Sequence, residues 1–226
     1  MDMRKIPLFC DALPSEVVEK IVFHLPLSTV AELMKSENAS LALVARRCYY
    51  SNIKLQFDYP PDYERSHISD KFLSMNVSDF EALVNSDTFS QLHIKKLLIN
   101  VYAHIENFTF LHEKVFAKVS LVVTNVILEF YADHEYHTVF SWDWLPSSPP
   151  VQECIREISI LYSYIDSDMP PLPPNLCKFN LLYGRQNYCD DNASAPKIVF
   201  PPSLQKFVSE IPWRSISAYA KLPSTF

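Results

Sequence analysis

Few residues in this sequence could do chemistry, and their spacing argues against a reaction. The segment Asp133-His134-Glu135-Tyr136-His137 holds residue types that bind zinc and activate a water molecule on it. Its two histidines are i, i+3 apart, however, and do not share the i, i+4 helical face that one metal ion needs. We expect a solvated loop here and no metal site.

Paired carboxylates, which can serve general acid–base catalysis, occur at Asp190-Asp191 and at Asp166 with Asp168. Both pairs lie in polar loop sequence without a partner base, so we expect them to keep loops solvated. The five cysteines are odd in number and widely spaced, which favours reduced, mostly buried thiols over a disulfide framework. They are Cys10, Cys48, Cys154, Cys177 and Cys189.

Gly184 is the single glycine in the sequence, against 17 prolines. Phosphate-cradling loops and dinucleotide fingerprints need several glycines, because only a residue without Cβ lets the backbone approach a phosphate closely. The same shortage excludes the Gly-x-Ser-x-Gly elbow, which holds a nucleophilic serine on a strained turn. We therefore expect no enzyme, no catalytic residues and no cofactor.

Composition indicates a folded chain that binds neither nucleic acid nor a membrane. Of the 226 residues, 48% are hydrophobic and 20% charged, as in globular proteins. The net charge of −6 is unfavourable for binding the negatively charged phosphate backbone of a nucleic acid. No apolar run reaches the roughly 18 to 20 residues that span a bilayer, and the start lacks the apolar stretch of a secretory signal. We expect an intracellular location, in the cytoplasm, the nucleus or both.

The chain opens with an amphipathic pattern. After Leu13-Pro14-Ser15-Glu16, apolar residues at i, i+1, i+4, i+5 and i+8 predict one helical face. These are Val17, Val18, Ile21, Val22 and Leu25. Pro14 fits at the start of the helix, where its missing N–H would be unpaired anyway, and Pro26 stops it.

Two further helices are predicted. Thr29-x-x-Glu32 has capping-box spacing, and Val30, Leu33 and Met34 supply an apolar face. The segment from Leu41 to Cys48 then predicts a helix leading into Ile53-Lys54-Leu55. Three such short helices cannot bury all their apolar faces among themselves, so some surface is left for a partner.

These residues resemble the F-box family, whose motif opens Leu-Pro-x-Glu and continues with apolar residues at this spacing. The resemblance implies that residues 8 to 55 dock on a Skp-type adaptor, which links them to a cullin and a RING protein in a ubiquitin ligase. The adaptor-binding residues would be Leu13, Pro14, Val17, Ile21, Leu25, Val30 and Leu33. The third helix departs from the Val-x-x-x-Trp/Phe stretch of many members. The alternative is an ordinary helical hairpin at the edge of a larger core.

After a short helix predicted near residues 79 to 86, the pattern changes to strands. An apolar-x-x-apolar spacing recurs at intervals of 29, 32, 21 and 28 residues. Its starting residues are Ile94, Val123, Ile155, Leu176 and Leu204. The intervals fall in or near the 20 to 29 residue period of leucine-rich repeats. In so apolar a chain, chance supplies many such matches, and the spacing alone proves nothing.

An internal repeat is the stronger signal. Leu172-Pro-Pro-Asn-Leu-Cys-Lys-Phe179 aligns with Phe200-Pro-Pro-Ser-Leu-Gln-Lys-Phe207, 28 residues later. Prolines end the preceding connection, and the Leu-x-x-Phe that follows can start a buried strand. Leu222 to Phe226 looks like the beginning of another copy, so we expect a fragment or a truncated member. Pro170 to Pro174 could instead be an SH3 or WW ligand, although the second Pro-Pro pair favours a structural role.

The repeat is similar to the irregular leucine-rich repeats that follow F-boxes in some fungal proteins. The resemblance implies an α+β chain: a three-helix F-box at 8 to 55, a helical connector at 56 to 93, and an irregular leucine-rich-repeat-like strand and loop solenoid at 94 to 226. The last region would bind a protein substrate of unknown identity. The resulting hypothesis is a substrate receptor of a ubiquitin ligase, and the alternative is a scaffold that binds the adaptor without promoting ubiquitination.

Overall fold

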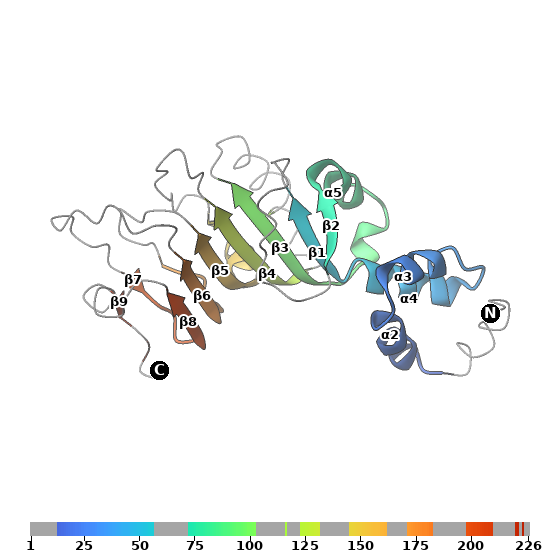
Figure 1. Ribbon diagram of the computed structural model, residues 1–226, viewed down its shortest axis with the longest axis horizontal. Helices are drawn as coiled ribbons and strands as arrows, with labels where there is room; N and C mark the ends of the chain where they lie inside the picture. The colour runs from blue at the N-terminus through green and yellow to red at the C-terminus, as the bar shows by residue number, and fades with distance from the viewer. Residues whose placement is uncertain are drawn as a thin grey trace.

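The protein is a mixed helix-and-strand chain with a parallel sheet (Figure 1), which agrees with the mixed class predicted. Its computed structural model describes residues 13–56, 72–102, 116, 123–131, 145–161, 171–182, 198–209, 220–221 and 223. The molecule is elongated, with the first helices at one end and the last strands at the other.

The first three described helices form what we call the helical unit: α2 (Ser15–Phe23), α3 (Leu27–Leu33) and α4 (Ala39–Tyr49). All three were predicted. Pro14 and Pro26 occupy the N-cap positions of α2 and α3, with φ of −54° and −57°. The predicted capping box at Thr29 therefore lies inside α3 rather than at its start.

The helical unit has a hydrophobic core of its own. Its buried members come from all three helices and include no residue of the cluster beneath the sheet. They are Val18, Val22, Val30, Leu41, Ala45 and Cys48. The unit therefore packs as a body in its own right, joined to the rest of the chain where α4 runs into the first strand.

Among the described residues, seven strands form a single sheet in the order β2-β1-β3-β4-β5-β6-β8, and every adjacent pair is parallel. Their bounds are β1 Asn52–Gln56, β2 Leu73–Asn76, β3 Ile94–Tyr102, β4 Val123–Tyr131, β5 Ile155–Leu161, β6 Lys178–Leu182 and β8 Lys206–Ser209. A second, two-stranded parallel sheet pairs β7 (Ile198–Val199) with β9 (Ala220–Lys221). The other elements within the described residues are α5 (Val77–Val84), η3 (Phe89–Gln91) and α8 (Pro149–Gln152).

The strands predicted from the repeated spacing are confirmed, with one change of register. Ile94 pairs with Val123, and Phe179 with Phe207, as the alignment requires. Between β4 and β5 the register shifts, so that Ile158 lies opposite Leu128 instead of Val126. A shift of two residues leaves each side chain on its original face, because side chains alternate along a strand.

One face of the sheet supplies the main core. Its apolar side chains are almost completely buried and pack with residues of α5 and α8, such as Phe80 and Val151. They include Ile53, Leu55, Leu97, Ile99, Val126, Leu128, Ile158, Ile160, Phe179 and Leu181. The opposite face, which we call the second face, carries Leu98 and Ile127 together with the polar residues Glu129, Ser159 and Asn180, all of them buried.

Candidate docking surface on the first helix

One face of α2 presents apolar side chains to solvent. Val17 and Ile21 are 40% and 50% exposed, and Pro14 is also exposed. Their spacing of three and four residues places them in one row along the helix. Aliphatic side chains of this size are usually among the most buried in a protein. We call these three residues the α2 surface.

The neighbouring side of α2 packs into the helical unit. Val18 and Val22 are 6% and 3% exposed and contact the core formed with α3 and α4. Each is one residue after a member of the α2 surface, so the sequence pattern joins the buried and exposed rows into one apolar face. In the structure, Val18 and Val22 are buried in the helical unit, whereas Val17 and Ile21 face solvent.

The structure places the other predicted adaptor-binding residues in different surroundings. Leu13, Leu25 and Leu33 are half-buried and pack against the edge of the helical unit's core. Val30 is only 2% exposed and belongs to that core. It can support a docking surface from beneath but does not present its side chain to a partner.

Two exposed apolar residues in the helical unit were not singled out from the sequence. Phe23 is 39% exposed and Leu43 is 37% exposed. Phe23 is two residues after Ile21 and therefore falls on a different side of α2. An aromatic side chain on a side of α2 away from the row of Val17 and Ile21 could have indicated, from the sequence, that another part of the chain contacts that side.

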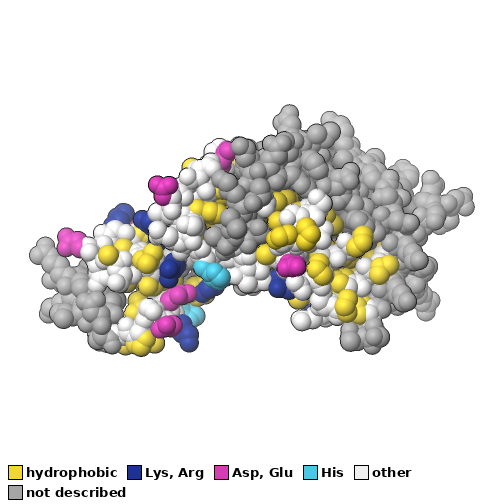
Figure 2. All heavy atoms as spheres, turned by 180° about the vertical axis from the view of Figure 1, so that it is seen from behind, with side chains coloured by type: hydrophobic (Ala, Val, Ile, Leu, Met, Phe, Trp, Pro, Cys, Tyr) yellow, Lys and Arg dark blue, Asp and Glu magenta, His cyan; other side chains and the backbone are white. Residues whose placement is uncertain are grey.

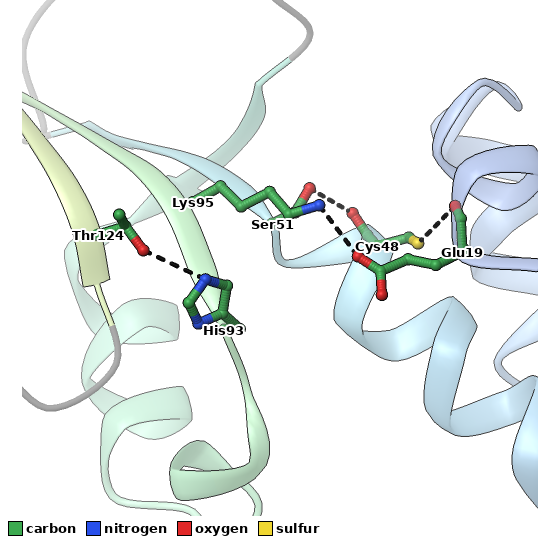
Figure 3. Close-up of polar contacts among 6 residues, drawn as sticks. All are labelled: Glu19, Cys48, Ser51, His93, Lys95 and Thr124. Atoms are coloured by element: carbon green, nitrogen blue, oxygen red, sulfur yellow. Dashed lines mark hydrogen bonds and ion pairs between the residues drawn. The ribbon is translucent and has the colours of Figure 1, made fainter. Parts of the chain in front are cut away.

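That neighbour is the sheet. Glu19 Oε1 in α2 accepts a hydrogen bond from Lys95 Nζ in β3 at 3.0 Å (Figure 3). Seen from behind, basic, acidic and histidine side chains gather in the notch where the helical unit meets the sheet (Figure 2). The carbonyl of Glu19 also lies 3.5 Å from Cys48 Sγ.

Cys48 reports the electrostatics of this junction. The pKa of its thiol is raised to about 11, mainly by burial and also by the nearby Glu19 carboxylate, while Lys95 acts in the opposite direction. A thiol is the weaker nucleophile when it holds its proton, so Cys48 is suited to a structural role at neutral pH.

A polar cluster on the second face ties β5 to β6. Asn180 Nδ2 donates to Glu157 Oε1 at 3.1 Å and to Ser159 Oγ at 2.7 Å. Lys178 forms an ion pair with the same Glu157 oxygen. These groups hydrogen bond to one another across the strand pair, an arrangement that stabilises the register of the sheet.

The remaining candidate motifs contribute no site in the described part of the chain. The Asp133–His137 segment and the carboxylate pairs at 166/168 and 190–191 lie outside the described residues. Among the residues the structure describes, no group of His, Cys, Asp and Glu could hold a metal ion. Cys48, Cys154 and Cys177 are free thiols. Pro173 is buried, which fits the structural role expected for the proline pair.

Nothing in the described helices combines the length and the hydropathy needed to cross a bilayer.

Comparisons with protein-family models, curated proteins and solved structures found no match. The α2 surface and the parallel sheet are therefore the features on which a function can be argued.

Proposed function

We propose that the chain is an F-box-type substrate receptor of a Skp–cullin–F-box ubiquitin ligase, acting in the cytoplasm or the nucleus. In this proposal the helical unit binds a Skp-type adaptor through the α2 surface, and the strand region holds a protein substrate. The observation that carries the proposal is the exposure of Val17 and Ile21 on one face of α2, directly after the Leu-Pro-x-Glu opening.

The physical reason is the free energy of covering apolar surface. Burying the exposed parts of Val17 and Ile21 would stabilise a complex by roughly 1 kcal/mol or more for each side chain. The helix that carries them is held by its own buried row, Val18 and Val22, so the surface is formed before a partner arrives. A preformed apolar row of this kind suits docking against another protein.

The sheet supports the second half of the proposal. Irregular leucine-rich repeats would supply one strand per unit in a parallel sheet, and β3, β4, β5, β6 and β8 follow one another in that way. The repeated Pro-Pro-x-Leu segments precede β6 and β8. Such a receptor needs no chemistry of its own, because it raises the effective concentration of a target lysine beside the ubiquitin carrier.

The decisive experiment measures adaptor binding to the full chain. We expect Ile21→Ala to weaken binding of a purified Skp-type adaptor by about 2 kcal/mol, as for a buried anchor at an interface. Val199→Ala is the matched control, because Val199 is 56% exposed in β7, at the other end of the molecule. Equal affinity of wild type and Ile21→Ala for the adaptor would overturn the proposal.

A second readout separates a ligase receptor from a scaffold. The chain is assembled with adaptor, cullin and RING protein, and ubiquitin transfer to captured proteins is measured. Transfer that depends on Ile21 supports the receptor. Adaptor binding with no transfer to any captured protein would favour the scaffold instead.

A further inference from the structure

We propose that Lys95 fixes the direction in which the α2 surface points relative to the sheet. Its Nζ atom binds Glu19 Oε1 at 3.0 Å and lies 5.2 Å from the centroid of the Phe23 ring. Glu19 and Phe23 are four residues apart, so they share one side of α2. A single cation from β3 therefore contacts two side chains along the same helix.

This contact leaves the α2 surface uncovered. Glu19 is two residues from Val17 and two from Ile21, and a helix turns by about 100° per residue. The side of α2 that binds Lys95 is therefore roughly opposite the side that faces solvent. The sheet and a docked partner can hold α2 at the same time.

A second attachment starts from the backbone of the same residue. The carbonyl of Ser51 accepts hydrogen bonds from the backbone N of Lys95 at 2.7 Å and of Lys96 at 3.1 Å. Ser51 Oγ donates to the Cys48 carbonyl at 2.8 Å, and Cys48 Sγ donates to the Glu19 carbonyl at 3.5 Å. Figure 3 shows Glu19, Cys48, Ser51 and Lys95 joined between the helices and the sheet.

Two attachments constrain the helical unit more than one does. A unit held only through Ser51 could rotate about that point, whereas the added contact between Lys95 and α2 restricts the rotation. The hydrophobic clusters of the helical unit and the sheet share no residue. Tyr49, which packs on the first cluster, and Tyr50, which packs on the second, meet edge to face with ring centroids 5.1 Å apart. The polar contacts at the junction add to this ring contact in setting the angle.

The consequence for ubiquitin transfer rests on the proposed function. A receptor with a fixed junction holds its substrate at a constant distance from the adaptor, which keeps the effective concentration of the target lysine high. A flexible junction broadens the range of distances between substrate and adaptor. It therefore lowers the rate of ubiquitin transfer without weakening the contact with the adaptor.

The test measures the distance between two spin labels in the full chain. The labels are attached through unnatural amino acids at Ser28 in α3 and Gln205 before β8, both exposed. We expect one narrow distance distribution for wild type and its loss in Lys95→Met and in Glu19→Gln. Lys95→Arg should restore the narrow distribution, because it keeps the cation.

Lys35→Met is the matched control, since Lys35 forms an exposed ion pair with Glu32 inside the helical unit at 2.8 Å. It should leave the distribution narrow. The proposal is overturned if Lys95→Met is as narrow as wild type, or if Lys35→Met broadens the distribution equally. Adaptor affinity, measured in parallel, should be the same for wild type and Lys95→Met. If neither binds, the proposed function fails while the distance result still decides the role of Lys95.

Discussion

Asn175 and Ser203 occupy the same position in two successive turns and each donates a side-chain hydrogen bond to the turn before it. Asn175 Nδ2 lies 3.1 Å from the Glu153 carbonyl, and Ser203 Oγ lies 2.7 Å from the Pro174 carbonyl and 2.8 Å from that of Leu176. The side chains thus link the turns much as backbone hydrogen bonds link the strands that follow.

Removing the Ser203 hydroxyl tests the link between turns. We expect Ser203→Ala to lower the free energy of unfolding by about 1 kcal/mol, the usual net value of one hydrogen bond. The loss is larger where water cannot replace the hydroxyl at the Pro174 and Leu176 carbonyls. Gln205→Ala is the control, because the Gln205 side chain is exposed and should change stability little. Urea unfolding measures both, and equal midpoints for the two variants would contradict the prediction.

Adjacent valines in α2 separate packing from docking. Val18→Ala should destabilise the helical unit by about 2 kcal/mol, because it leaves a cavity in a core where Val18 is 6% exposed. Val17→Ala should change stability by less than about 0.5 kcal/mol, since that side chain already faces solvent. Thermal unfolding followed by circular dichroism checks the difference. A large loss of stability in Val17→Ala would mean that this side chain is covered.

Stability should fall at alkaline pH through Cys48. The thiol pKa is raised from 9.0 to about 11 in the folded chain, so the unfolded chain loses this proton first. The contribution to stability is present below pH 9 and is lost as pH rises towards 11, because the unfolded chain is then stabilised by giving up the proton. Each pKa unit between the two states corresponds to about 1.4 kcal/mol. The raised pKa of Tyr50, also caused mainly by burial, acts in the same direction.

The Cys48 contribution is isolated by comparing urea midpoints at pH 7.5 and pH 10 for wild type and Cys48→Ala. The variant should show a smaller loss of stability between the two pH values, whatever its starting stability. An identical loss in both proteins would show that Cys48 does not titrate differently on folding.

The cap of α4 gives an independent prediction. Asn38 Oδ1 accepts a hydrogen bond from the Leu41 backbone N at 3.0 Å and satisfies a donor that the helix leaves unpaired. Asn38→Ala should cost about 1 kcal/mol of stability, while Asn38→Asp, which keeps the acceptor, should cost much less. If alanine and aspartate behave alike in chemical denaturation, the cap contributes little.

The regular elements could be predicted because their signals are local. Proline positions and helical spacing indicated the three helices of the helical unit, and recurring apolar triplets indicated β3, β4 and β5. The short helix expected near 79 to 86 is α5, although its cap is Asn76, whose side chain accepts from the Asp79 backbone N at 2.7 Å.

What the sequence could not supply depends on contacts between distant segments. β2 pairs with β1 and extends the sheet, yet its residues Leu73–Asn76 show only alternating partial burial. Val17 and Val18 look equivalent in a helical pattern, and the core that α2 forms with α3 and α4 decides which one faces solvent. The pairing of Glu19 with Lys95, 76 residues later, has no local signal at all.

From β3 to β8 the strands of the main sheet pair in the order in which they occur along the chain. During synthesis each of them would leave the ribosome after the strand it pairs with. The nascent chain can therefore add one strand at a time to an edge already in place, and each new strand is separated from its partner by only 16 to 23 residues of sequence. A chain whose synthesis is interrupted would keep the strands that have already paired. The unpaired edge of its last strand would then be the site most prone to aggregation.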